Sequence, residues 1–277
     1  MDNRKKYYYA LFGNPVNHSL SPIIHKIFSK QINLNYNYKT ILTPKNCLKK
    51  FLDNFFKKSD NLGANITLPF KTEVLKYVDN ITKKAKISGA INTLKKINEK
   101  HILGDNTDGV GIIYDLRRLN FLKKKCKILL IGAGGAAQGI IPYLLLNKNI
   151  VFIYNRTFLK ALNLEKKFCN IGNIICLKKE CLKNNNFDLV INATSSGVFG
   201  GVPNIPKSII SENVFCYDLY FDLLKETPFI KWCKKNGAIN VKDGIGMLVG
   251  QAAYSCYLWN KKFPDVKKTI KILQKNI

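Results

Sequence analysis

The stretch Ile128–Ala137, which reads ILLIGAGGAA, decides the fold. Four apolar residues are followed at once by glycines in the spacing G-x-G-x-x-A and then by a helical stretch, the context that a dinucleotide-binding fingerprint requires. Glycines allow a tight turn, and the N-terminus of the following helix offers free N–H groups and a positive dipole end to a pyrophosphate. A glycine turn between any strand and helix is the plain alternative. We predict that Gly132, Ala133, Gly134, Gly135 and Ala136 form a cofactor-binding loop.

The end of the next apolar strand distinguishes between the two nicotinamide cofactors. An NAD enzyme usually places an acidic residue there for the ribose 2′-hydroxyl, but this chain has Asn155-Arg156-Thr157. Asn155 carries no charge, whereas the planar donor fork of Arg156 suits a 2′-phosphate, and Lys160 adds a second positive charge. A solvated arginine on a basic protein is the alternative. The pattern favours NADP.

Outward from this stretch, strands alternate with helices and predict an α/β protein with two lobes. Residues 109–244 form a Rossmann-type, doubly wound dinucleotide-binding lobe, with strands at 127–131, 150–154, 174–177, 189–192 and 214–218. Residues 1–108 form an α/β substrate lobe, which C-terminal helices at 245–277 complete.

The substrate lobe is expected to hold a largely parallel sheet covered on both faces. Strands are expected at 7–12, 35–41, 64–68, 91–97 and 101–104, and helices at 47–58, 71–78 and 108–119. Ser21-Pro22 is expected to open a helix that runs to about Gln31, with Ser21 as its N-cap.

Composition excludes several other classes of protein. The 277 residues are 46% hydrophobic and 23% charged, the balance of a protein with a real core. The net charge is +27, but only four of the 45 basic residues are arginine and the lysines are spread along the chain. A nucleic-acid binder would often cluster its charge and favour arginine. We therefore attribute the charge to a bias toward Lys, Asn and Ile typical of an AT-rich coding sequence, and expect no nucleic-acid partner.

Cysteines and hydropathy indicate the cellular setting. The eight cysteines contain no C-x-x-C pair and several lie in apolar runs, which suits reduced, buried thiols rather than zinc or disulfides. Residues 1–9 lack the apolar run of a signal peptide, and the uncharged stretch 128–146 contains too many glycines for a membrane helix. We expect a cytoplasmic protein with no membrane partner.

Polar residues gather beside glycines in the substrate lobe. Ser19 and Ser21 flank the start of a helix, where hydroxyls and free N–H groups can hold a carboxylate, although Ser21 as a simple N-cap is equally compatible. The segments 63–71, 89–93 and 104–109 add Lys71, Asp108 and several amides and hydroxyls. A Lys and an Asp among such groups suit a polyol whose hydroxyl loses a proton while its carbon loses a hydride.

These segments together resemble the shikimate dehydrogenase family. They are 12–15 with 18–22, 63–71, 89–94, 104–109, 131–136, 155–157, 191–197 and 243–252, in the family's order across almost the whole chain. The resemblance implies NADPH-dependent reduction of 3-dehydroshikimate to shikimate in chorismate and aromatic amino acid biosynthesis, with no metal. It leaves open a homodimer.

The resemblance also implies roles for individual residues. Lys71 would be the acid/base residue and Asp108 its partner. The substrate would contact Ser19, Ser21, Asn65, Thr67, Asn92, Asp108, Phe221 and Gln251. The cofactor would contact residues 132–136, Asn155, Arg156, Thr157 and Lys160, with Leu219 and Gly244 near the nicotinamide.

One departure and three alternatives accompany this interpretation. The family usually has a tyrosine where this chain has Phe221, so either the hydroxyl is lost or Tyr220 supplies it after a local shift. The alternatives are a quinate/shikimate dehydrogenase with mixed NAD and NADP use, a folate-pathway dehydrogenase, and a non-catalytic basic binding protein. Asn155-Arg156 argues against the first, because an acidic residue there would have favoured it. The segment 65–71 fits the second less well. The third predicts the loss of Lys71 or Asp108, and both residues are present.

Overall fold

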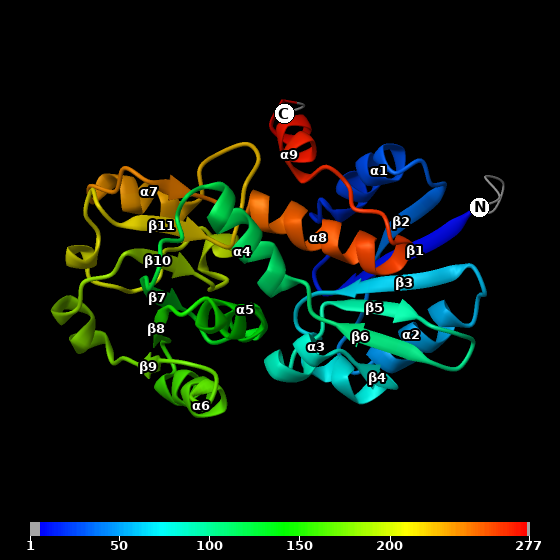
Figure 1. The fold of residues 1–277 in the computed structure, drawn as a ribbon, viewed down its shortest axis with the longest axis horizontal. Helices are drawn as coiled ribbons and strands as arrows, with labels where there is room; N and C mark the ends of the chain where they lie inside the picture. Colours follow the sequence, from blue (N-terminus) through cyan, green and yellow to red (C-terminus); the bar gives the residue numbers. More distant parts are fainter. Residues whose placement is uncertain (1–5, 276–277) are drawn as a thin grey trace. The chain divides into compact units, whose positions relative to one another are not determined.

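The computed structural model describes residues 6–275 and divides into two compact units. One unit comprises the chain up to Gly111 together with Val249–Leu273, and the other contains Ile112–Leu248 and the chain from Gln274 onward. Each unit is built on its own six-stranded sheet (Figure 1).

The first unit carries the sheet β2-β1-β3-β5-β6-β4. Its strands are β1 (Tyr7–Gly13), β2 (Tyr36–Leu42), β3 (Asn61–Ile66), β4 (Asn80–Ile81), β5 (Thr93–Lys96) and β6 (Ile102–Asp105). Its helices are α1 (Ser21–Gln31), α2 (Leu48–Phe56), η1 (Glu73–Tyr77), α3 (Lys83–Ser88) and α9 (Val266–Lys275), with the start of α4 (Asp108–Arg118) and most of α8 (Ile245–Asn260).

Both faces of this sheet are covered. Successive side chains of a strand point to opposite faces, so neighbouring residues of β1 contact different helices. Ala10 and Phe12 of β1 pack in one core with the apolar stripe of α2, whose residues Leu48, Leu52 and Phe55 recur at helical spacing. On the other face Tyr9 stacks on Trp259 of α8, with ring centroids 4.4 Å apart. The predicted double coverage of this sheet is confirmed.

The second unit has the strand order β12-β11-β10-β7-β8-β9, and all its strand pairs are parallel. Its strands are β7 (Lys127–Ile131), β8 (Ile150–Tyr154), β9 (Ile174–Cys176), β10 (Leu189–Asn192), β11 (Phe215–Asp218) and β12 (Val241–Lys242). Its helices are α5 (Gly135–Leu146), α6 (Phe158–Phe168), α7 (Pro228–Lys235) and the short η2 (Lys179–Asn184), η3 (Ser196–Phe199) and η4 (Lys207–Ile209). This order is that of a doubly wound dinucleotide-binding fold, so the predicted fold class is confirmed.

Apolar residues on both faces of β7 explain why its sequence is a continuous hydrophobic run. Ile128 and Leu130 pack in one core with α5 and α6, whereas Leu129 and Ile131 pack in the opposite core with α7. The order reverses between β7 and β10, and ligands of such sheets bind at this switch point, beyond the carboxyl ends of the strands. The glycine loop after β7 therefore lies where a ligand is expected.

Two local predictions were wrong and a third needs a detail. The helix expected at 71–78 is a 3₁₀ helix over Glu73–Tyr77. The sheet is largely parallel, as expected, but strand β5 runs antiparallel to β3 and β6; the tight connection in which Ile97 N donates to His101 O allows only an antiparallel β5–β6 pair. Ser21 is the first residue of α1 rather than its N-cap; the cap position is Leu20, and no side chain caps this helix.

The eight cysteines are all free thiols, as expected, but their burial differs. Cys126, Cys216, Cys233 and Cys256 are buried, and burial raises the pKa of the Cys126 thiol. Cys169 and Cys181 are exposed, so the expectation of buried thiols holds only for part of the set.

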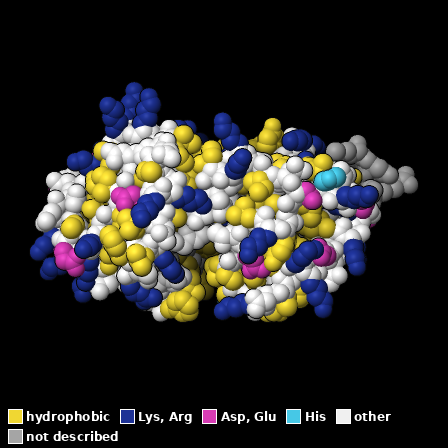
Figure 2. Space-filling view, turned by 90° about the horizontal axis from the view of Figure 1, so that it is seen from below, with side chains coloured by type: hydrophobic (Ala, Val, Ile, Leu, Met, Phe, Trp, Pro, Cys, Tyr) yellow, Lys and Arg dark blue, Asp and Glu magenta, His cyan; other side chains and the backbone are white. Residues whose placement is uncertain are grey.

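Lysine and arginine side chains are scattered over the face of the molecule drawn in Figure 2 rather than gathered in one patch. Few acidic side chains lie among them (Figure 2), as the net charge of +27 requires. Among residues 6–275, no helix has the length and apolar character needed to cross a bilayer.

Candidate functional site

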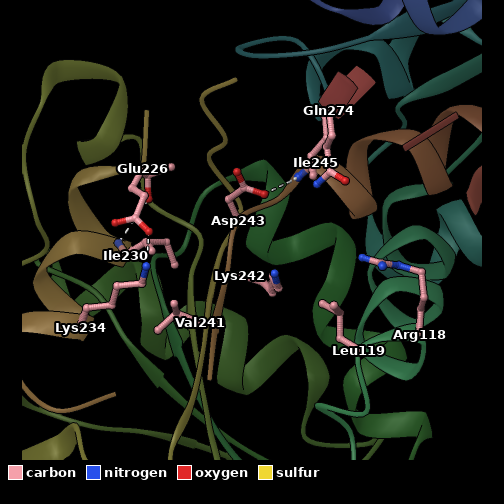
Figure 3. Close-up of a pocket in the computed structure, with 11 residues that line it drawn as sticks. Arg118, Leu119, Glu226, Ile230, Lys234, Val241, Lys242, Asp243, Ile245 and Gln274 are labelled. Carbon is pink, nitrogen blue, oxygen red and sulfur yellow. Dashed lines mark hydrogen bonds and ion pairs between the residues drawn. The ribbon is translucent and has the colours of Figure 1, made fainter. Parts of the chain in front are cut away.

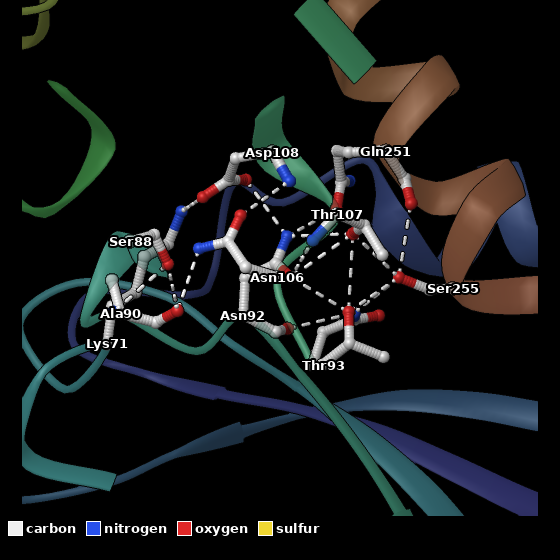
Figure 4. Close-up of polar contacts among 11 residues, drawn as sticks. Lys71, Ser88, Ala90, Asn92, Thr93, Asn106, Thr107, Asp108, Gln251 and Ser255 are labelled. Carbon is white, nitrogen blue, oxygen red and sulfur yellow. Dashed lines mark hydrogen bonds and ion pairs between the residues drawn. The ribbon is translucent and has the colours of Figure 1, made fainter. Parts of the chain in front are cut away.

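An ion pair between Lys71 and Asp108 forms the centre of a polar cluster in the first unit (Figure 4). Lys71 Nζ donates to Asp108 Oδ2 at 2.6 Å, and the two side chains are 16% and 5% exposed. Lys71 follows β3, and its backbone is held where Ile91 N donates to Lys71 O at 2.7 Å. Asp108 opens α4, and its backbone N–H donates to Asn106 Oδ1. A nearly buried ammonium and carboxylate are thus held at fixed positions.

Asn92 joins this ion pair to α8. Its Nδ2 donates to Asp108 Oδ1 at 2.9 Å, to Thr107 Oγ1 at 2.9 Å and to Gln251 Oε1 at 3.2 Å. Its Oδ1 accepts from the backbone N–H of Thr107 at 2.8 Å. Because one N–H of Asn92 is directed at Asp108, Asn92 leaves Oδ2 of that carboxylate for Lys71 (Figure 4).

The side-chain amide of Asn65 is fixed by several hydrogen bonds within the protein. Its Nδ2 lies within hydrogen-bond distance of three acceptors: Asn92 O at 3.0 Å, Thr93 Oγ1 at 3.1 Å and Ser255 Oγ at 3.0 Å. An amide NH₂ has two hydrogens, so Asn65 has no donor left for a ligand. Its oxygen remains able to accept from a ligand hydroxyl.

Ser19 and Thr67 lie on loops at the same edge of the sheet, and Ser21 opens α1 just after Ser19. Strands β1 and β3 are parallel neighbours, so the loops that follow them adjoin, and Asn14 N donates to Leu68 O at 2.9 Å. The Ser19 hydroxyl accepts from Ser21 N at 3.2 Å. The Thr67 methyl group lies against Gly13, where an added Cβ would approach it to 2.2 Å.

The structure therefore brings together most of the predicted residues of the first unit, and it adds others. Sequence reasoning missed Ser255, which contacts Asn65, Thr93 and Thr107. It lies four residues after Gln251, one helical turn on the same face, and this spacing was the available signal. It also missed Tyr38, whose hydroxyl donates to Asn65 Oδ1 at 2.8 Å.

In the second unit, the glycine loop has the geometry of a phosphate cradle. Gly132 has φ +113°, and an added Cβ would lie 2.9 Å from Ala193 O, so glycine is required there by the chain itself. Gly134 differs, because a Cβ there would meet nothing within 4 Å. Gly134 is the N-cap of α5, with no side-chain cap and no acidic residue in the first turn. Open space and uncapped N–H groups fit a pyrophosphate.

The loop after β8 adjoins this cradle, since Gly132 N donates to Tyr154 O at 2.8 Å. Asn155 Nδ2 donates to Thr157 O at 2.9 Å and so ties the loop together. Thr157 is the N-cap residue of α6 but makes no side-chain cap bond. Arg156, Thr157 and Lys160 are exposed at this helix start, which leaves two cations and uncapped N–H groups available to an anion.

Leu219 and Gly244 are in contact beyond the end of β11. A Cβ added to Gly244 would lie 2.3 Å from Leu219 O, and Gly244 N donates to Tyr220 O at 3.2 Å. The buried Asp218 fixes this turn by accepting from Tyr220 N at 3.2 Å, Asn192 Nδ2 at 2.9 Å and Thr227 Oγ1 at 2.6 Å. Burial raises the pKa of Asp218 to about 6, although these hydrogen bonds oppose the shift.

Phe221 and Tyr220 lie side by side in this turn, with ring centroids 6.4 Å apart. The Tyr220 ring packs against Gly197, where an added Cβ would lie 2.6 Å from Cδ1. Which of the two rings would contact a substrate stays a prediction.

A separate groove of about 370 Å³ lies in the second unit, beside α7 and β12 (Figure 3). Lys234 and Glu226 pair with each other across one end, and Asp243 accepts from Ile245 N at 3.4 Å. None of the predicted site residues lines it. Within residues 6–275, no three His, Cys, Asp or Glu side chains gather where they could hold a metal ion.

Comparison with protein families gives two matches along the chain. Residues 11–94 match the shikimate dehydrogenase substrate binding domain, and residues 116–199 match the shikimate / quinate 5-dehydrogenase family.

Solved structures resemble the whole chain. An Ael1 enzyme from Pseudomonas putida is 31% identical with a TM-score of 0.87, covering 96% of this chain and 98% of that one. The shikimate 5-dehydrogenase from Thermus thermophilus, in complex with NADP(H) and shikimate, is 28% identical with a TM-score of 0.85, covering 98% and 100%. The Listeria monocytogenes enzyme, in complex with shikimate and NAD, shares the fold at 24% identity and a TM-score of 0.85, covering 97% and 96%. With both of its units matched and the Lys71–Asp108 pair in place, the chain belongs to the shikimate dehydrogenase family.

Proposed function

We propose that this protein catalyses the reversible NADPH-dependent reduction of 3-dehydroshikimate to shikimate, a step toward chorismate and the aromatic amino acids. The observation that carries the proposal is the Lys71–Asp108 pair, held at 2.6 Å within a buried network of amides and hydroxyls. The family match supports the reaction class.

Lys71 is the acid/base residue of the proposal. In the reducing direction its ammonium gives a proton to the carbonyl oxygen of the substrate, and in the oxidising direction the amine takes that proton back. Asp108 accepts a hydrogen bond from Lys71 and so fixes the position of the nitrogen. Bound NADPH would supply the hydride, so this chain's own tasks are orientation and proton transfer.

The proposed substrate contacts divide by chemistry. Ser19 and Ser21 donate hydroxyl hydrogens to the carboxylate. Thr67, Asp108, Gln251 and the oxygen of Asn65 bind ring hydroxyls. Asn92 orients Asp108 through its Nδ2 at 2.9 Å, and Phe221 contributes apolar contact.

The proposed cofactor site lies at the carboxyl ends of β7 and β8. Residues 132–136 hold the pyrophosphate, supported by the open space at Gly134. Arg156 and Lys160 meet the 2′-phosphate, Asn155 and Thr157 shape that loop, and Leu219 with Gly244 borders the nicotinamide. The two exposed cations and the lack of an acidic residue at Asn155 favour NADP over NAD.

A quinate/shikimate dehydrogenase with mixed cofactor use is the second candidate. Two observations favour it: the description of the matching family includes quinate, and the Listeria structure contains NAD.

An absorbance assay of cofactor reduction separates the two candidates. Shikimate and quinate are each offered with NADP and with NAD. Turnover confined to shikimate with NADP is the expected result. Comparable rates with quinate or NAD favour the second candidate, and no turnover with any pair contradicts both.

A further inference from the structure

Tyr38 occupies a defined place beneath the polar cluster of the first unit. It lies on β2 and pairs with Tyr9 of β1. Its ring stacks on His25 of α1, with centroids 4.1 Å apart and planes 5° from parallel. Burial lowers the pKa of His25 to about 3, so that ring stays neutral at physiological pH. The stack fixes the direction of the Tyr38 ring and therefore the place of its hydroxyl.

The Tyr38 hydroxyl bonds a side chain of the proposed substrate site. It donates to Asn65 Oδ1 at 2.8 Å. Burial raises the pKa of Tyr38, so the hydroxyl keeps its proton and remains a donor across the physiological range.

This bond begins a continuous chain of polar contacts. It runs from Tyr38 to Asn65, and from there through Ser255 and Thr107 to Asn92 and the Lys71–Asp108 pair. Without the hydroxyl, Asn65 Oδ1 loses the donor that faces it.

We propose that Tyr38 is a positioning residue that holds Asn65 ready for a ring hydroxyl of the substrate. The inference rests on the proposed function. On binding, Tyr38 continues to hold the Asn65 amide, whose oxygen has a second lone pair for a substrate hydroxyl. The role concerns substrate binding rather than proton transfer, so it acts on KM for shikimate.

The test compares Tyr38→Phe with Tyr36→Phe in steady-state kinetics. Phenylalanine keeps the ring that stacks on His25 and removes only the hydroxyl. Tyr36 lies two residues away on the same strand, and its hydroxyl bonds His25 Nδ1 and Cys256 Sγ, outside the chain of contacts. We expect Tyr38→Phe to raise KM for shikimate about tenfold, equivalent to one hydrogen bond. Its kcat and its KM for NADP should change less than about threefold, and Tyr36→Phe should leave all three near wild type.

A double variant separates positioning from a general loss of structure. In an Asn65→Ala background, Tyr38→Phe should raise KM for shikimate by clearly less than it does alone, because the residue that Tyr38 positions is already gone. An unchanged KM in Tyr38→Phe, or an equal rise in Tyr36→Phe, overturns the inference while leaving the proposed function intact. A wild-type protein without turnover overturns the proposed function and this inference with it.

Discussion

At the scale of single residues, the side chains of the candidate site fall into two kinds. Some use all their hydrogen-bond donors within the protein, and others keep donors for a substrate. Asn65 and Asn92 each present their NH₂ group to three acceptors within the protein, whereas Lys71 Nζ has one acceptor among residues 6–275, Asp108. An ammonium has three hydrogens, so Lys71 retains donors for a substrate oxygen. The lysine is therefore the group best placed to exchange a proton, and the amides keep its surroundings rigid.

Arg156 gives a prediction on cofactor choice. Arg156→Ala should raise KM for NADP about tenfold to a hundredfold, because a hydrogen bond to a charged group contributes about 1.5–3 kcal/mol. KM for NAD, which lacks the 2′-phosphate, should change little. Arg117→Ala is the matched control, since Arg117 is bonded to Asn147 on the surface of the same unit. An equal change with both cofactors in Arg156→Ala would refute the 2′-phosphate contact.

At the scale of elements, the two glycines of the loop between β7 and α5 have different physical roles. Gly134→Ala should leave stability near wild type, because the new Cβ meets nothing within 4 Å, yet raise KM for NADP by filling the pyrophosphate space. Gly132→Ala should lower the free energy of unfolding by about 1 kcal/mol or more, since alanine disfavours a φ of +113°. Urea unfolding and kinetics on both variants test this contrast. A KM for NADP near the wild-type value in Gly134→Ala would show that the pyrophosphate does not occupy this space.

The turn after β11 gives a prediction on pH. The pKa of Asp218 rises from 3.8 to about 6 on burial, so the folded protein holds a proton that the unfolded chain releases between these values. The free energy of unfolding should therefore fall as pH rises from 4 to 7, by up to about 3 kcal/mol from this group.

Asp218→Asn provides the comparison, because it keeps the shape and removes the charge. Urea titrations at several pH values give the unfolding free energy of wild type minus that of the variant, and this quantity should fall as pH rises. A value that is constant or that rises with pH would contradict the raised pKa of Asp218.

Elements differ in how far the sequence predicts them. Strands β7, β8 and β10 were predicted to the residue, because each is built on an apolar run of three or more residues with polar or glycine residues beside it. The antiparallel direction of β5 was missed, since alternation of apolar residues carries no information on strand direction. Tyr38 and Ser255 were also missed, because their contacts with Asn65 join positions 27 and 190 residues apart.

At the scale of the whole molecule, charge and fold are separate matters. The two-unit α/β architecture follows from apolar runs and glycines, whereas the basic side chains behind the net charge of +27 are scattered over the face drawn in Figure 2. So large an excess of one sign opposes the compact state through self-repulsion.

This repulsion gives a prediction on salt. Raising NaCl from 0.01 to 0.15 M shortens the screening length from about 30 Å to about 8 Å, so the thermal unfolding midpoint should rise. Choline chloride should produce a similar rise, because screening depends on ionic strength rather than on the cation. A midpoint that stays constant or falls would mean that the surface charge is not a significant cost to stability.

We propose that Lys71 exchanges the proton with the substrate oxygen, and the turnover of Lys71→Ala decides whether it does. Lys76→Ala, a change of an exposed lysine on η1, serves as the control and should behave as wild type. We expect Lys71→Ala to lose about 10²-fold to 10⁴-fold in kcat while shikimate binding, followed by calorimetry, stays measurable. Turnover near the wild-type rate would contradict the role of Lys71.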